Sequence, residues 1–226
     1  MRIHRRLCQS NYMKQHLSSR FFSSCVIAGI PLTFIPWATL ELLRSDHNPL
    51  RNMLNEYLIG PFSFLGTAAA CVLAATFLML LVGLRRSVRS SGFLTASCVL
   101  LGVVVVSLCA SAVFPIDARP PDGSRPTFTW AGVIHFVSAV RFPALLIAIL
   151  LTLPGAYKRD EKWRSFSHVT LFLGLLILAF QAVFIFAPFD LRGLVQRGIG
   201  LVILAWLLLT SMRLRQATPS TDATAA

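Results

Sequence analysis

Charged side chains are scarce in this sequence. They make up 13% of its 226 residues, whereas hydrophobic residues make up 55% and the mean hydropathy is +0.69. Soluble globular domains typically carry about 25% charged residues. The scarcity excludes a soluble globular protein and indicates a polytopic membrane protein, because the hydrophobic residues gather in runs long enough to cross a bilayer.

Few residues interrupt these apolar runs. A run of about 18 residues or more suffices for a transmembrane helix, and six such runs lie near residues 21–43, 58–83, 92–114, 131–153, 166–187 and 194–212. We therefore predict an all-α fold, a bundle of six transmembrane helices within residues 21–215. Residues 1–20 are predicted to form a flexible basic flank, and residues 216–226 a disordered tail.

Acidic residues are the scarcer charged residues, nine against 21 Lys and Arg. A basic excess can indicate nucleic-acid binding, but here the basic residues gather in alternate loops. Fourteen lie in the two terminal segments and in the loops after the second and fourth runs, against six on the other side. Because basic residues favour cytoplasmic loops, we predict that both termini are cytoplasmic, in a bacterial inner membrane. No nucleic acid is expected as a partner.

Cysteine is rare, with five residues at positions 8, 25, 71, 98 and 109. None falls in a loop predicted to lie outside the cell, so no structural disulfide is expected. A cleavage site of small residues is also lacking after the first apolar run. That run is long enough to span the membrane and is therefore predicted to remain as an anchor.

Two hairpins in the second half of the chain share a pattern. Pro115–Asp117 closes the third run and Pro188–Asp190 closes the fifth, whereas Gly132–His135 opens the fourth and Gly193–Gln196 opens the sixth. Each hairpin thus presents Pro-x-Asp and then Gly-x-x-polar. Two explanations of this pattern stay open: an internal duplication, or convergence of the two hairpins on similar turn chemistry.

The fourth run carries polar residues that a bilayer disfavours. Gly132, His135, Ser138 and Arg141 recur every three residues and form one polar stripe on a helix. At 1.5 Å per residue, Arg141 lies roughly 15 Å into the span, near the middle of the hydrocarbon core. Its insertion costs on the order of 3 kcal/mol, so Arg141 is expected to face protein or a water-filled cavity.

Asp117 and Asp190 follow the C-terminal ends of the third and fifth spans. The helix dipole disfavours a carboxylate there unless a cation or several donors face it, and we expect Arg141 and Arg197 to supply that charge. The polar residues would then form a pocket that opens outward, with Arg141 at its floor. The predicted binding residues are Arg141, Arg197, Asp117, Asp190, Ser138, Glu56 and Gln196.

Several chemistries fit this pocket. Two arginines suit the phosphate of a lipid headgroup or a similar anion. His135 is the candidate catalytic residue of a lipid-modifying enzyme, because its side chain titrates near neutral pH. A nucleophilic Ser138 lacks a Gly-x-Ser-x-Gly context, and the His and Asp residues lack a diagnostic metal spacing, so neither a metal nor a cofactor is expected. The alternative to a binding or catalytic site is that the same polar residues form a purely structural network that holds the helices together.

The order of these motifs resembles that of a known bacterial family of six-span membrane proteins, catalogued as domain of unknown function 998 (DUF998). The resemblance covers roughly residues 20–215 and rests on Asn55-Glu56-Tyr57 with Gly60-Pro61, Phe114-Pro115-Ile116-Asp117, Gly132-x-x-His135 and Gly193-Leu194-Val195-Gln196-Arg197. The family usually has a small polar residue where Ile116 stands. A looser similarity, in the Phe-Pro turn and the following His, is to the Frag1/DRAM/Sfk1 membrane proteins, some of which are linked to lipid anchor remodelling. Neither resemblance implies a reaction.

The sequence therefore leaves several hypotheses open. The first is a membrane protein that binds a lipid headgroup or a similar anion in its outward pocket. The alternatives are a structural partner of a second copy or of another membrane protein, a lipid-modifying enzyme that uses His135, and a small transporter. The inner halves of the spans offer little polar lining, which counts against a transporter.

Overall fold

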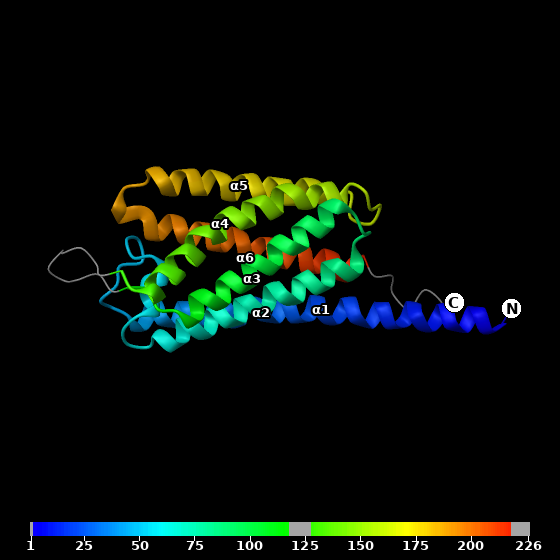
Figure 1. Cartoon of the computed structure of the whole chain (residues 1–226), viewed down its shortest axis with the longest axis horizontal. Coiled ribbons are helices and arrows are strands. Elements are labelled where there is room, and N and C mark those ends of the chain that lie inside the picture. Colours follow the sequence, from blue (N-terminus) through cyan, green and yellow to red (C-terminus); the bar gives the residue numbers. More distant parts are fainter. Residues whose placement is uncertain (1, 118–127, 218–226) are drawn as a thin grey trace.

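The computed structural model describes the backbone of residues 2–117 and 128–217, with side chains from Ser19 onward. These residues form six long helices and two short 3-10 helices, without a strand in the described ranges (Figure 1). Each long helix contains a segment long and apolar enough to cross a membrane, which confirms the predicted all-α fold with six candidate spans. The elements are α1 (Arg2–Leu43), η1 (Leu54–Leu58), α2 (Ser63–Ser87), α3 (Gly92–Val113), α4 (Trp130–Tyr157), α5 (Phe166–Phe186), η2 (Phe189–Leu191) and α6 (Arg192–Gln216).

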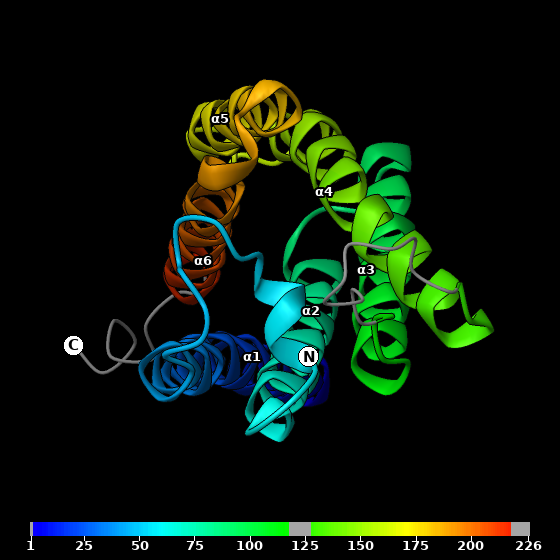
Figure 2. The ribbon, with the colours of Figure 1, turned by 90° about the vertical axis from the view of Figure 1, so that its left-hand side faces the viewer.

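The helices form a ring in chain order, because each packs against the next and α6 returns to α1 (Figure 2). We call the end of the bundle with the loops before α2, α4 and α6 the Asp117 end. The opposite end, with the loops before α3 and α5, is the terminal end, because α1 starts and α6 ends there (Figure 1).

Some helix boundaries differ from the predicted spans, because turn residues and charged residues determine where these helices begin and end. The second span starts at Ser63, not near residue 58, because Gly60 (φ 82°), Pro61 and Phe62 (φ 61°) form a turn before it. It continues to Ser87 because basic residues are favourable in the last turn of a helix. α1 begins at Arg2, so helical backbone extends through the flank predicted to be flexible. The predicted tail falls mostly on residues 218–226, outside the described residues.

The buried core lies mainly in the half of the bundle near the terminal end. Trp206 and Phe77 are fully buried there, and the rings of Tyr157 and Trp163 stack with centroids 4.8 Å apart. In lipid, helices associate through close packing and hydrogen bonds rather than through the hydrophobic effect. One such bond, from Ser23 Oγ to the carbonyl oxygen of Ser211 (2.8 Å), joins α1 to α6. Most of the fully buried side chains therefore lie in the half near the terminal end.

Candidate functional site

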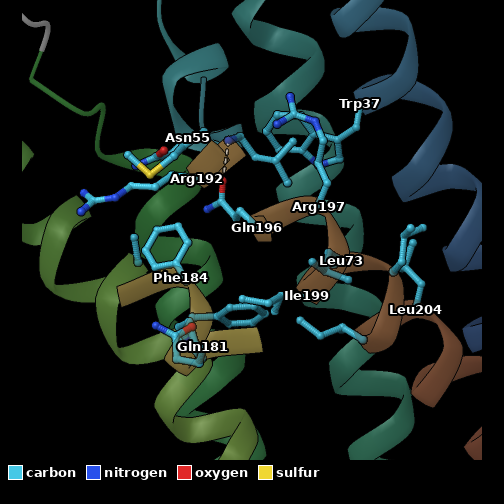
Figure 3. A pocket seen from close by; sticks show the side chains of 18 of the residues that line it. Trp37, Asn55, Leu73, Gln181, Phe184, Arg192, Gln196, Arg197, Ile199 and Leu204 are labelled. Carbon is cyan, nitrogen blue, oxygen red and sulfur yellow. Dashed lines mark hydrogen bonds between the residues drawn. The ribbon is translucent and has the colours of Figure 1, made fainter. Parts of the chain in front are cut away.

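A cavity of about 750 Å³ lies inside the ring, in the half near the Asp117 end. Side chains from α1, α2, α4, α5 and α6 line it, and most of them are apolar. Figure 3 shows Leu73, Ile199 and Leu204 in its deeper part and Arg192 near its upper end. The lining extends along α6 from Arg192 to Leu204, which is about 18 Å at 1.5 Å per residue. The cavity is therefore about as deep as one leaflet of a bilayer, whose hydrocarbon layer is about 15 Å thick.

Arg197 lies at the upper end of this cavity, where protein groups occupy its guanidinium. Its Nε donates to Glu41 Oε1 at 2.6 Å, and its Nη1 donates to the carbonyl oxygens of Asn52 and Gly193 at 2.9 and 3.0 Å. Its Nη2 donates to the hydroxyl of Tyr57 at 3.4 Å. Arg197 therefore joins α6 to α1 and to the loop before α2, and Glu41 neutralises its charge.

Arg192 is a second cation in the lining, and its environment differs. Its guanidinium carbon lies 5.9 Å from the ring centroids of both Phe184 and Phe189. Its Nε is buried without a hydrogen-bond partner among the described residues, as is Oδ1 of the neighbouring Asn55. In Figure 3 the Arg192 side chain points away from Arg197. Arg192 thus has a positive charge that no described carboxylate neutralises. Its buried Nε–H is a hydrogen-bond donor without a partner among the described residues.

A loop of residues 44–62, which we call the roof loop, covers the Asp117 end of the cavity. It contributes Met53, Leu54 and Asn55 to the lining. The backbone N–H of Leu54 donates to Gln196 Oε1 at 2.7 Å, and the N–H of Leu194 donates to the carbonyl oxygen of Leu50 at 3.0 Å. The start of α6 therefore fixes this loop through both a side chain and the backbone.

Arg44 closes the roof loop on itself. Its side chain is only 6% exposed, and its Nε and Nη2 both donate to the Asp46 carboxylate at 2.8 Å. Its Nη1 donates to the carbonyl oxygen of Ile59 at 2.8 Å, at the other end of the loop. The guanidinium holds the pKa of Asp46 well below its usual range, and burial raises the pKa of Tyr57. At neutral pH the Arg44–Asp46 pair is therefore ionised and the Tyr57 phenol is neutral.

Two of the predicted binding residues lie in a separate polar cleft of about 770 Å³, lined by the roof loop, Asp117 and Phe189. Glu56, one of the two, accepts a hydrogen bond from Asn52 Nδ2 at 2.6 Å. Nearby, Asp190 pairs with Arg51 at 3.6 Å, and both side chains are largely exposed. The carboxylate that pairs with Arg197 is therefore Glu41, not one of the predicted acidic residues.

Asp117, the other predicted residue in this cleft, caps the start of α4. Its carboxylate accepts from the N–H and the hydroxyl of Thr129 at 3.1 and 2.6 Å. The same hydroxyl accepts from the N–H of Gly132 at 3.0 Å, and a Cβ on Gly132 would overlap the Asp117 carboxylate. The prediction that Arg141 or Arg197 neutralises Asp117 is therefore wrong. The positive pole of α4 and the donors of Thr129 stabilise it instead.

His135 performs the reciprocal task at the end of α3. Its Nδ1 lies 3.1 and 2.9 Å from the carbonyl oxygens of Ser111 and Phe114, so this nitrogen carries the proton. The side chain is 1% exposed, and its Nε2 has no partner among the described residues. His135 is not part of the lining of either cavity. Its contacts therefore make it a cap of the end of α3, and a catalytic role stays a prediction.

The predicted polar stripe of the fourth span divides between two faces of α4. Gly132, His135 and Ser138 are buried, whereas Arg141 is exposed and donates from Nε to the carbonyl oxygen of Val137 at 3.1 Å. Six residues at 3.6 per turn bring a side chain about 120° around the helix from its starting point. Arg141 therefore leaves the buried face that His135 occupies, and the prediction that it forms the floor of the pocket is wrong.

A family model described as "Protein of unknown function (DUF998)" matches residues 27–213. The chain belongs to the DUF998 family. No curated protein and no solved structure matches it. In this DUF998 protein, the motifs that suggested a single binding pocket form two different structures. Phe114–Asp117 and Gly132–His135 cap each other across one hairpin, and Gly193–Arg197 anchors the roof loop.

Sequence reasoning missed Arg192, Glu41 and Arg44. Arg192 and Arg44 were among the six basic residues of the predicted outer loops, which were used only to predict the orientation in the membrane. Glu41 lies inside the first apolar run. The position of Arg192 directly before the Gly193 motif is the one signal that could have found it.

The described residues contain no group of three or more His, Cys, Asp or Glu side chains arranged to hold a metal ion. The cysteines with described side chains, Cys25, Cys71, Cys98 and Cys109, are free thiols, and Cys8 lies outside them.

Proposed function

We propose that this DUF998 protein binds a membrane lipid, with an acyl chain in the cavity and an anionic headgroup at Arg192. The single observation that carries the proposal is the arrangement of the cavity lining. Apolar walls extend for about one leaflet depth, and the charged side chains in the lining, Glu41, Arg192 and Arg197, lie near the Asp117 end. A lipid combines an apolar chain with a polar head in the same order.

The charges near the Asp117 end favour an anionic lipid. Glu41 and Arg197 neutralise each other at 2.6 Å, which leaves the charge of Arg192 for a ligand. Gln196 and Asn55 line the cavity beside it and supply further polar groups. Guanidinium binds phosphate through paired hydrogen bonds, as the proposed headgroup requires.

The proposed location is a bacterial inner membrane, with the Asp117 end outside and both termini in the cytoplasm. The positions of the basic residues support this orientation. The cavity then belongs to the outer leaflet. A membrane partner without a lipid site is the alternative that the following test addresses.

The test is native mass spectrometry of the protein incubated in detergent with phosphatidylglycerol or with phosphatidylethanolamine. We expect the wild type to retain phosphatidylglycerol preferentially. Arg192→Gln removes one charged hydrogen-bonding group, worth about 1.5–3 kcal/mol, so the affinity for phosphatidylglycerol should fall by about tenfold or more. Arg141→Gln is the matched control and should change nothing, because Arg141 is exposed outside the cavity.

A second variant in the same experiment tests the apolar part. Gly200 lines the cavity, and a Cβ there would meet no atom within 4 Å, so Gly200→Leu fills the space without a clash at Cβ. It should reduce retention of both lipids, whereas Gly102→Leu, outside the lining, should not. Equal retention by the wild type and all four variants, or no adduct in any of them, would exclude a lipid site in this cavity.

A further inference from the structure

The cavity has a side that faces the bilayer, between α4 and α5. Figures 1 and 2 show these helices side by side near the loop that joins them and separated toward the Asp117 end. Phe136 and Val140 of α4 and Ile185 of α5 all line the cavity, and they are 65%, 57% and 61% exposed. The same side chains thus face both the interior of the cavity and the surface of the bundle, and all three are apolar.

A second possible opening lies toward water at the Asp117 end, and a third lies between α1 and α6, where Phe34 and Leu201 line the cavity and are 50% and 60% exposed. The roof loop crosses the Asp117 end in Figure 2, and Arg197, Gln196 and Leu194 bind it through four hydrogen bonds to Asn52, Tyr57, Leu54 and Leu50. At the terminal end the packed core closes the ring, with Trp206 and Leu207 fully buried. A ligand that enters from water must break this network, whereas one that enters from lipid passes only apolar side chains.

We infer that the gap between α4 and α5 is a lateral portal through which one acyl chain of a bilayer phospholipid enters the cavity. This inference rests on the proposed function and adds the route by which the acyl chain enters. Arg192 and Phe184 line the cavity beside this gap, close to the Asp117 end. The phosphate can therefore reach Arg192 at headgroup level while the chain passes between the helices. The depth of the cavity, about one leaflet, matches a chain from a single leaflet, so the second chain of the lipid remains in the bilayer.

The experiment uses the whole protein in vesicles that contain phosphatidylglycerol with a photoreactive diazirine in one acyl chain. Ile199 and Ile203 line the cavity yet are only 5% and 4% exposed, so a bilayer lipid outside the ring cannot reach them. After illumination, fragmentation of the labelled peptides should place label on Ile199 or Ile203, and not only on Leu201 between them, which is 60% exposed. Label on these two side chains, called α6 labelling below, reports an acyl chain inside the cavity.

Two variants should move this labelling in opposite directions. Val140→Phe with Ile185→Phe narrows the portal and should reduce α6 labelling severalfold, whereas Phe136→Ala widens it and should increase labelling. The matched control is Val137→Phe with Val183→Phe, on the same two helices but outside the lining, and it should leave labelling at the wild-type level. These exposed positions tolerate the changes because no core packing depends on them.

The outcomes separate the portal from the lipid site itself. If α6 is labelled equally in the narrowed, widened and control proteins, a chain reaches the cavity by another route and the portal is wrong, while the lipid site stands. If α6 of the wild type is never labelled, although lipid-facing residues are, no chain enters and the proposed function fails as well.

Discussion

Arginine has three different environments in the half of the molecule near the Asp117 end. Arg44 and Arg197 are bound to carboxylates and carbonyl oxygens of the protein, where they connect distant segments of the chain. Arg141 is exposed on α4, and Arg192 lines the cavity without a hydrogen-bond partner in the described part of the chain. The charge of the residue is the same in each case. Its role is decided by whether the fold brings acceptors to it, which the local sequence does not reveal.

Gly193 at the start of α6 lies directly against the backbone of the roof loop. A Cβ at this position would lie 2.5, 2.6 and 2.8 Å from the carbonyl oxygens of Asn52, Pro49 and Leu50. Backbone atoms cannot move away as a side chain can, so Gly193→Ala should displace the roof loop and lower the free energy of unfolding by about 1–3 kcal/mol. Gly200→Ala is the matched control, because a Cβ there meets nothing within 4 Å.

The measurement is thermal unfolding in detergent. Gly193→Ala should unfold at lower temperature than the wild type, and Gly200→Ala at the same or a higher temperature, since Ala favours helix over Gly by about 1 kcal/mol. Equal unfolding temperatures for the two variants would show that the contact between α6 and the roof loop contributes no stability.

At the scale of helices, the two hairpins with a shared sequence pattern use it differently. In the α3–α4 hairpin, Asp117 and His135 satisfy the free backbone groups of each other's helices. In the α5–α6 hairpin, Asp190 is exposed and Gln196 binds the roof loop instead. Helix ends leave backbone donors and acceptors without partners, so a polar residue near an end is often a cap. The same residue types in the same order therefore do not indicate the same contacts.

This difference predicts unequal effects at the two Pro-x-Asp positions. Asp117→Ala removes two hydrogen bonds at the start of α4 and a favourable charge at its positive pole. It should lower the free energy of unfolding by about 1–2 kcal/mol. Asp190→Ala removes only an exposed ion pair and should change the free energy by less than about 0.5 kcal/mol. Chemical denaturation in mixed micelles compares them, and an equal loss of stability would contradict the cap.

At the scale of the whole molecule, hydrophobic run length alone predicts the six helices and their order, because bilayer thickness fixes the length of a span. The members of the candidate site were only partly predictable. Gln196 and Arg197 do line the cavity, but Arg192 was missed, and Arg141 was misplaced because three-residue steps rotate around a helix. The cavity itself is lined by five helices and the roof loop, so no single segment of the sequence carries a signal for it.

The orientation of the bundle in the membrane decides which leaflet the cavity belongs to, and the lipid proposal depends on it. Ser45 and Ser90 are exposed and lie in loops at opposite ends of the bundle. In a variant whose five natural cysteines are replaced, Ser45→Cys and Ser90→Cys are nearly isosteric changes that place one thiol at each end. If basic loops are cytoplasmic, a membrane-impermeant maleimide should label Ser45→Cys in intact cells and Ser90→Cys only after permeabilisation. The reverse pattern would place the Asp117 end, and with it the cavity and Arg192, in the cytoplasmic leaflet.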